Sequence, residues 1–202
     1  MRGKSKVLLV LVALCVALAL TATTALAASN TDCPGGDAGQ HEAAIGSTHY
    51  DTLEEAIGEA NTDSGCVVKL LTNVEISTPI TMSGAYTLDL NDKIVTAAED
   101  TMAGSNGTQC IFTTKGDITI QDGSINSTVC RGIYVYSGEF KLNNVDMTTY
   151  KRALMIDNAL ATVDQNCVLS IGEGGMDAAI VVWGTGNYET DSISQHPTLH
   201  FY

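Results

Sequence analysis

The chain has few basic residues, and this shortage excludes one class of partner. Its 202 residues include 10 Lys and Arg against 23 Asp and Glu, so the formal net charge is −13. Binding to nucleic acid through phosphate contacts requires the opposite balance, and we expect no nucleic-acid partner. Aromatic residues are also scarce, at 5%, but 45% of the residues are hydrophobic, which is too apolar for a disordered chain. The length suits one domain with a sizeable core.

The common metal and redox motifs are missing. No C-x-x-C sequence occurs, which argues against a zinc ribbon or a thioredoxin-type site. His196 and His200 are spaced as i and i+4, but they have no Glu-x-x-His context and no third ligand. We therefore expect no metal and no cofactor. Five cysteines follow residue 27, so at least one stays unpaired or pairs between molecules. Buried thiols and disulfides both remain open, and the strand alignment below favours Cys110 with Cys130 for any disulfide.

The N-terminal segment has the order of a secretory signal peptide. Arg2, Lys4 and Lys6 precede an uncharged stretch at 7–20, and small residues then lead to an Ala-Leu-Ala cleavage site that ends at Ala27. As a helix the uncharged stretch would span ~21 Å, which is shorter than the ~30 Å hydrocarbon core of a bilayer. We expect residues 1–27 to be cleaved, leaving a secreted or cell-surface protein with no stable membrane span.

One helix is predicted, shortly before the strands begin. Residues 28–46 are rich in glycine, aspartate and small residues and predict a flexible leader. In segment 47–65, Asp51 with Glu54 three residues later is typical of a helix start. The apolar residues that follow share one helical face: Leu53, Ala56, Ile57 and Ala60. We expect this helix to cover the open edge of the first strand.

From Cys66 onward the chain alternates between apolar and polar residues, and the alternation repeats. The first series of apolar pairs begins at intervals of 20, 30, 22 and 21 residues: Val68/Leu70, Leu88/Leu90, Ile118/Ile120, Phe140/Leu142 and Ala161/Val163. The second series is spaced by 22, 21 and 26 residues and starts at Ile111, Ile133, Leu154 and Ile180. A short period with no helix in each unit predicts an all-β fold, a parallel β-helix of about five rungs over residues 66–183. Residues 184–202 would be a C-terminal tail or an incomplete last rung.

Three segments resemble the opening of pectin-lyase-like proteins. They are YDTLEEAI at 50–57, VVKLLTNV at 67–74 and TLDLNDKI at 87–94. The chain is similar, over about residues 47–183, to the adhesin-like version that Gram-positive bacteria export to their surface. The resemblance implies a short right-handed parallel β-helix with an N-terminal capping α-helix. One departure is Asp92, where glycine is usual in the family, and it leaves the conformation of that turn open.

The sequence assigns no catalytic residue. Enzymes of the pectin-lyase-like family use clustered carboxylates, often with calcium, and an arginine or lysine that abstracts a proton. The outward positions of the first series form no acidic cluster here: Lys69, Asp89, Thr119, Lys141 and Thr162. Asp157, with Arg152 five residues before it, is more typical of a surface pair than of a catalytic dyad. We expect a non-enzymatic binding module, with a polysaccharide lyase or glycoside hydrolase as one alternative and a structural fragment of a larger adhesin as another.

A line of outward side chains is the candidate binding surface. If the second series points inward from Ile111 onward, the neighbouring residues point outward and form an apolar and aromatic ribbon. Such a ribbon suits stacking on sugar rings or packing against a protein, so we expect a glycan or a surface protein as partner. The candidate ligand contacts are Phe112, Tyr134, Tyr136, Met155, Asp157 and Trp183. The alternative is that residues 185–202 fold back over the ribbon.

Overall fold

The structure is a computed structural model that describes residues 41–102, 109–172, 178–183 and 198–201, all within the compact unit Asp32–Tyr202. The signal peptide expected at 1–27 lies outside the described residues.

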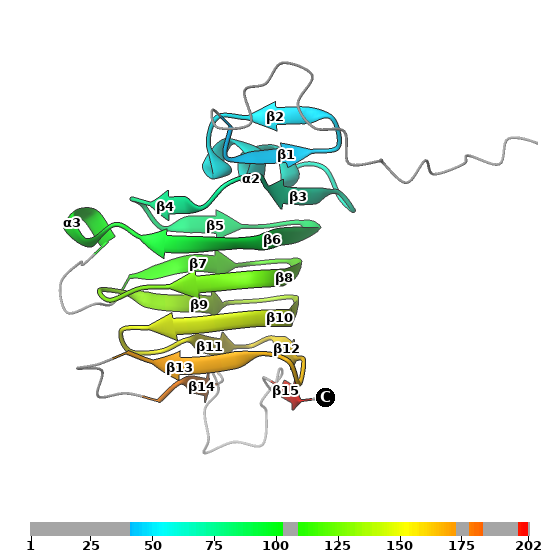
Figure 1. Cartoon of the computed structure of the whole chain (residues 1–202). Coiled ribbons are helices and arrows are strands. Elements are labelled where there is room, and N and C mark those ends of the chain that lie inside the picture. The colour runs from blue at the N-terminus through cyan, green and yellow to red at the C-terminus, as the bar shows by residue number, and fades with distance from the viewer. Residues whose placement is uncertain (1–40, 103–108, 173–177, 184–197, 202) are drawn as a thin grey trace, which may run out of the picture. The chain divides into compact units, whose positions relative to one another are not determined.

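The strands form two sheets (Figure 1). The ten-stranded sheet contains β1 (Ala43–Ile45), β2 (Thr48–Tyr50), β3 (Val67–Leu70), β4 (Val74–Ile76), β6 (Ala85–Ala97), β8 (Asp117–Asn126), β10 (Glu139–Thr149), β12 (Leu160–Val163), β13 (Val168–Ile171) and β15 (Thr198–Phe201). The five-stranded sheet contains β5 (Ile80–Met82), β7 (Cys110–Thr114), β9 (Arg131–Val135), β11 (Leu154–Asp157) and β14 (Ile180–Trp183). Within the described ranges, the helices are α2 (Leu53–Ala60) and the short α3 (Glu99–Met102).

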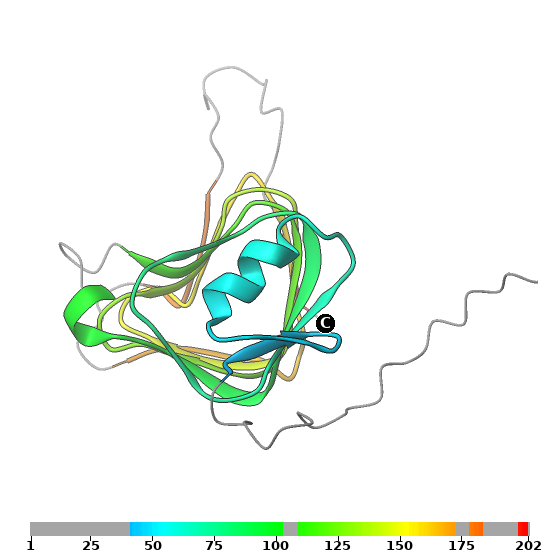
Figure 2. The same ribbon diagram turned by 90° about the horizontal axis from the view of Figure 1, so that it is seen from above.

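Each middle unit of the sequence repeat adds one long strand to the ten-stranded sheet and one short strand to the five-stranded sheet, whereas the first and last units each add two short strands to the larger sheet. Strands β6, β8, β10 and β12 pair in parallel, so that Ile120 lies beside Leu88 and Leu142, and Leu142 beside Val163. All ten apolar residues of the first series are buried, as the alternation predicts. Seen from above, strands of successive units superimpose and α2 lies across the space between the sheets (Figure 2). Phe112, Phe140, Leu88 and other fully buried side chains fill that space as a single core.

The expected fold class, a right-handed parallel β-helix of about five rungs with an N-terminal capping α-helix, is corrected by the structure. The fold consists of two sheets, and the larger one is mixed, because β1 is antiparallel to both β2 and β3. Strands expected as separate short segments are continuous, since β6, β8 and β10 run for 13, 10 and 11 residues. The edge of β3 is paired by β1, which lies in the segment expected to be a flexible leader.

The long strands β6, β8 and β10 each bend at a polar residue and continue beyond the bend. They are long because these bends do not end the strands. Asp92, Asp122 and Asn144 have φ angles of 58°, 56° and 53°, in the left-handed region that aspartate and asparagine tolerate best after glycine. The Asn144 amide donates to Asp122 Oδ1 at 2.9 Å. The side chain of Asn91 donates to the Leu70 carbonyl of the preceding unit at 2.9 Å. Asn and Asp side chains of successive units therefore bond one another or the neighbouring backbone at these corners, and the positive φ of Asp92 explains why glycine suits that position.

Helix α2 forms where the sequence predicts it, with its start one residue later than expected. The N-cap is Thr52, whose Oγ1 accepts a hydrogen bond from the Glu55 N–H at 3.2 Å. The carboxylate of Glu42 accepts the Leu53 N–H at 2.8 Å, which satisfies a second free donor of the first turn. The predicted apolar stripe is fully buried against the core. Within the described residues, neither helix is long and apolar enough to cross a membrane.

Candidate functional site

The candidate site lies on the outer face of the five-stranded sheet. Its strands pair in parallel with a fixed offset, so that Thr113, Tyr134, Met155 and Val181 occupy one row. The neighbouring row, which points into the core, contains Phe112, Ile133, Leu154 and Ile180. The register therefore aligns Phe112, and not Ile111, with the inward residues of the later units.

Phe112 was expected to contact ligand, and the structure corrects this. Its side chain is 0% exposed and belongs to the core cluster. Cys110, Ile111 and Phe112 are buried in succession, so the local sequence has no alternation from which the inward residue could be recognised. Thr114, two residues further along β7, is also 0% exposed and pairs with the buried Val135.

Three of the expected contact residues come together on the outer face. The Tyr134 hydroxyl donates to Asp157 Oδ2 at 3.0 Å. The rings of Tyr134 and Tyr136 meet edge to face, with centroids 5.9 Å apart and an interplanar angle of 78°. Tyr136 is 48% exposed, so about half of its surface remains open to a ligand. We call Tyr134, Tyr136 and Asp157 the tyrosine–aspartate cluster.

Lys115 is a neighbour of this cluster that the sequence analysis missed. Its Nζ lies 5.8 Å from the centroid of the Tyr136 ring, a cation–π distance. The contact follows from the pairing of Thr114 with Val135, which sets the residues after them, Lys115 and Tyr136, side by side. Predicting the contact between Lys115 and Tyr136 from the sequence would have required the correct register of β7.

The electrostatics of the cluster keep Tyr134 a hydrogen-bond donor. Burial, followed by the hydrogen bond and negative charge of Asp157, raises the pKa of Tyr134 to about 12. The Asp157 side chain is 4% exposed, and its Oδ1 has no hydrogen-bond partner among the residues that the structure describes. A buried carboxylate oxygen without a donor is costly, at roughly 1–3 kcal/mol or more. The site therefore has an unused acceptor beside an exposed aromatic ring.

The remaining expected contacts lie beside the cluster. Met155 is 2% exposed, and its Sδ lies 3.9 Å from Arg152 Nη1, so it supports the site from below the surface. The backbone of Trp183 pairs with Asp157, whereas its side chain lies outside the described part of the chain. The described end of the tail, β15, pairs with β12 in the ten-stranded sheet and not with the five-stranded sheet.

The expected disulfide between Cys110 and Cys130 is absent, and both cysteines are free and buried. Sγ of Cys130 lies 3.2 Å from Ser127 Oγ instead. Burial raises the pKa of Cys110 to about 11, so its thiol stays protonated near neutral pH.

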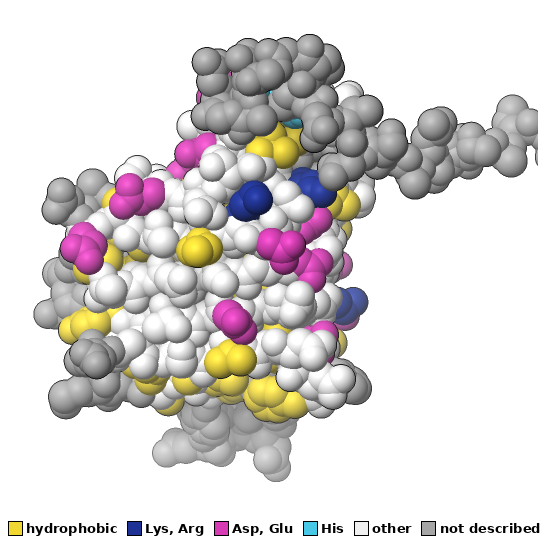
Figure 3. Space-filling model, viewed as in Figure 1, with side chains coloured by type: hydrophobic (Ala, Val, Ile, Leu, Met, Phe, Trp, Pro, Cys, Tyr) yellow, Lys and Arg dark blue, Asp and Glu magenta, His cyan; other side chains and the backbone are white. Residues whose placement is uncertain are grey.

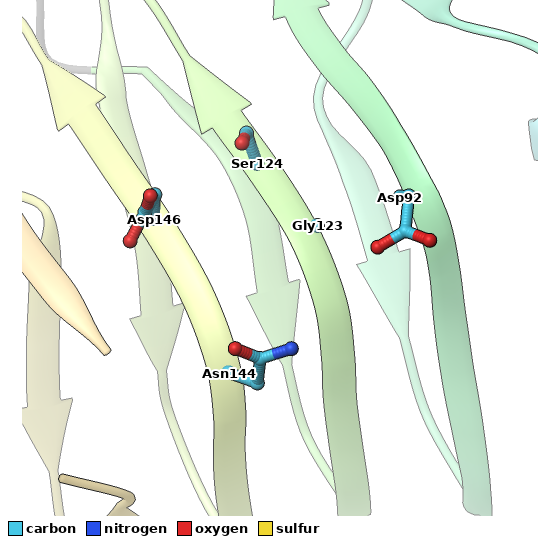
Figure 4. A pocket seen from close by; sticks show the side chains of 5 residues that line it. All are labelled: Asp92, Gly123, Ser124, Asn144 and Asp146. Atoms are coloured by element: carbon cyan, nitrogen blue, oxygen red, sulfur yellow. The ribbon is translucent and has the colours of Figure 1, made fainter. Parts of the chain in front are cut away.

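A second hollow, of about 230 Å³, lies on the ten-stranded sheet between β6, β8 and β10 (Figure 4). It is lined by Asp92, Gly123, Ser124, Asn144 and Asp146. The two carboxylates come from β6 and β10, with β8 between them, so their strands are ~10 Å apart. Among the described residues, no group of three or more His, Cys, Asp or Glu side chains could hold a metal ion. The face around this hollow is mostly neutral and polar, with single acidic, basic and hydrophobic side chains (Figure 3).

Comparison with known proteins gives no family for this chain. No protein-family model, no curated protein and no solved structure matches it. The resemblance to pectin-lyase-like proteins therefore stays a prediction from the sequence, and the function has to be argued from the site itself.

Proposed function

We propose that this chain is a non-enzymatic glycan-binding module and that the tyrosine–aspartate cluster is its contact surface. The observation that carries the proposal is the geometry of Tyr136, whose ring is 48% exposed and is held edge to face by Tyr134. Tyr134 is itself fixed by its hydrogen bond to Asp157. Tyr136 directly follows β9, and a pre-ordered ring there loses little conformational entropy on binding, which favours stacking on a sugar.

The ring of the cluster, and not its buried carboxylate, is the part that a sugar can reach. Asp157 Oδ1 lacks a donor among the described residues, but the atom is buried, so a ligand hydroxyl does not reach it in this conformation. The exposed part of the Tyr136 ring matches the apolar face of a pyranose.

A glycan is a better partner for this face than a protein. Tyr136 is its one exposed large hydrophobic residue among those the structure describes, because the exposed Val182 pairs with the buried Ile156 in the inward row. A stable protein interface buries ~800 Å² on each partner around a contiguous apolar centre, and one isolated side chain does not provide it. One sugar ring, by contrast, needs one aromatic ring.

Binding is also favoured over hydrolysis. Glycosidases use two carboxyl groups, ~5–10 Å apart, on either side of the scissile bond. On the strands of the five-stranded sheet, as far as the structure describes them, Asp157 is the one carboxylate. The raised pKa of Tyr134 keeps its hydroxyl protonated, so it is poorly suited to act as a base.

A glycan array tests this proposal. The chain without residues 1–27 is applied to immobilised glycans, together with Tyr136→Ala, Tyr136→Phe and the control Val67→Ala. Val67 is 46% exposed on the other sheet, so its truncation removes an equally exposed apolar side chain elsewhere. We expect Tyr136→Ala to abolish binding, while Tyr136→Phe and Val67→Ala retain it.

Three results would overturn the proposal. Unchanged binding by Tyr136→Ala would remove the cluster from the contact surface. Release of unsaturated or reducing sugars from a bound polysaccharide would replace binding by a lyase or hydrolase activity. Absence of glycan binding combined with Tyr136-dependent capture of one purified surface protein would replace the glycan by a protein partner.

A further inference from the structure

A separate hollow of about 500 Å³ lies where β8 and β10 end, outside the tyrosine–aspartate cluster. It is lined by Asn126, Ser127, Thr128, Thr148, Tyr150 and Gly172. Its volume falls within the ~300–1,000 Å³ that is usual for small-molecule sites. We propose that this hollow binds one uncharged sugar unit, independently of the function proposed above.

The hollow is neutral in a strongly acidic protein. None of its lining residues carries a charge, although 16% of the chain is charged. Two charges of opposite sign contact its lining residues: the Glu99 carboxylate accepts from Thr128 Oγ1 at 2.8 Å, and Lys151 Nζ lies 5.4 Å from the centre of the Tyr150 ring. Such a balance favours neither an anionic nor a cationic ligand. It suits an uncharged one with many hydroxyl groups.

The polar side chains of the hollow divide into fixed and free groups. Ser127 Oγ accepts the N–H groups of Val129 and Cys130 at 3.1 and 2.9 Å, so it serves the turn. Thr148 Oγ1 shares a hydrogen bond of 2.9 Å with Ser170 Oγ. The amide of Asn126 and the hydroxyl of Tyr150, in contrast, make no hydrogen bond to any residue that the structure describes.

The free groups are the ones that recognise a sugar. An asparagine amide offers an acceptor and two donors, which can bond neighbouring hydroxyl groups at the same time. The Tyr150 ring offers an apolar face for the C–H side of the sugar, and Lys151 lies over the ring, so one face remains for the ligand. Gly172 also lines the hollow and adds no side chain to it. Because Asn126 ends β8 and pairs with Thr148 of β10, two of the lining positions are set by the sheet.

Ligand-observed NMR tests the proposal on the chain without residues 1–27. The probes are the methyl glycosides of glucose, galactose, mannose and N-acetylglucosamine. We expect saturation transfer to at least one of them, with a dissociation constant on the order of 1 mM. The variants Asn126→Ala and Tyr150→Ala should weaken that binding by roughly three- to tenfold each, which corresponds to one lost neutral hydrogen bond or one ring contact.

A matched variant keeps the interpretation specific. Thr96→Ala removes the side chain beside Asn126 on β6, outside the hollow, and should bind the probe as the unchanged chain does. Tyr136→Ala removes the ring of the tyrosine–aspartate cluster and so measures how much of the signal comes from that other site. Tyr150→Phe and Asn126→Ser provide milder changes should an alanine variant fail to fold.

The outcomes separate this site from the other one. No saturation transfer to any of the four glycosides would overturn the proposal, and so would binding that Asn126→Ala and Tyr150→Ala leave unchanged. Binding that Tyr136→Ala abolishes, and Tyr150→Ala does not, would assign the sugar to the tyrosine–aspartate cluster alone. Failure of the glycan array with retained binding here would contradict the proposed function and leave this inference standing.

Discussion

The register of the five-stranded sheet predicts losses of stability of very different size for two aromatic residues that the sequence had placed on the same surface. Phe112 is 0% exposed and pairs with Ile80 on one side and Ile133 on the other. Phe112→Ala removes a buried ring whose neighbours are held by strands ~4.8 Å apart, so the cavity cannot close. We expect a loss of about 3–5 kcal/mol in the free energy of unfolding. Tyr136→Ala, at a side chain 48% exposed, loses the edge-to-face contact with Tyr134 and should cost about 0.5–1.5 kcal/mol.

Urea unfolding followed by far-UV circular dichroism measures both losses. With a slope of ~2 kcal/mol per molar urea, Phe112→Ala should lower the midpoint by roughly 2 M and Tyr136→Ala by roughly 0.5 M. Because a whole domain is stable by about 5–15 kcal/mol, the Phe112 variant should still fold in water. Equal midpoints for the two variants, or a larger loss for Tyr136→Ala, would refute the register and place Phe112 on the outer face.

Three further predictions concern ionisation, backbone conformation and thiol reactivity. The pKa of Tyr134 is raised to about 12, and Asp157→Asn should lower it. It should stay above the ordinary tyrosine value, because burial is the larger cause of the shift. Ultraviolet titration of the tyrosine measures this pKa. Since the folded-state pKa exceeds the value of about 10 expected in the unfolded chain, the stability from this group is complete below pH ~10 and is lost as the pH rises towards 12. Gly138→Ala should lower Tm, because φ at Gly138 is 88° and a Cβ atom would overlap the backbone of the preceding unit, whereas Gly58→Ala in α2 meets open space and should raise Tm slightly. Cys110 is buried with a pKa of about 11, so it should react with a disulfide reagent only on unfolding; fast reaction in the folded chain would contradict its position.

The sequence predicted what depends on simple periodicity. The stripe that includes Leu53 and Ala60 is buried on α2, as the spacing of three and four residues implies. The alternating pairs such as Leu88/Leu90 and Phe140/Leu142 all point into the core, because period two sorts side chains between the faces of a strand. These features need only local sequence.

The sequence did not predict what depends on pairing between distant strands. The expected alignment of β7 was wrong by one residue and therefore placed Phe112 on the surface. Three consecutive buried residues at the start of β7 give no alternation from which the inward positions could be recognised. The hairpin of β1 and β2 was missed because Ala43–Ile45 is too short and too small-sided for a strand pattern. The two-sheet arrangement was missed because left-handed corners such as Asp122 let one strand continue through a bend that looks like a turn in the sequence.

The tyrosine–aspartate cluster was predicted only in part, because its prediction also depends on the register between strands. Tyr134, Tyr136 and Asp157 were selected because strands of the second series could be aligned from Ile133 onward, where alternation is clear. Lys115 follows β7, where the alignment was wrong, and its contact with Tyr136 was therefore not expected. The sequence thus predicted the cluster residues on strands that it aligned correctly. It did not predict the residues whose position depends on the register of β7.

Chemical-shift mapping is the most direct test of glycan binding by this face. An isotopically labelled chain is titrated with whichever glycan gives the strongest array signal, and the ring and amide resonances are followed. We expect the largest changes at the rings of Tyr134 and Tyr136 and at the amide of Asp157, with the core ring of Phe112 unmoved. Changes confined to another face, or a saturating glycan that leaves these tyrosine rings unperturbed, would contradict the account.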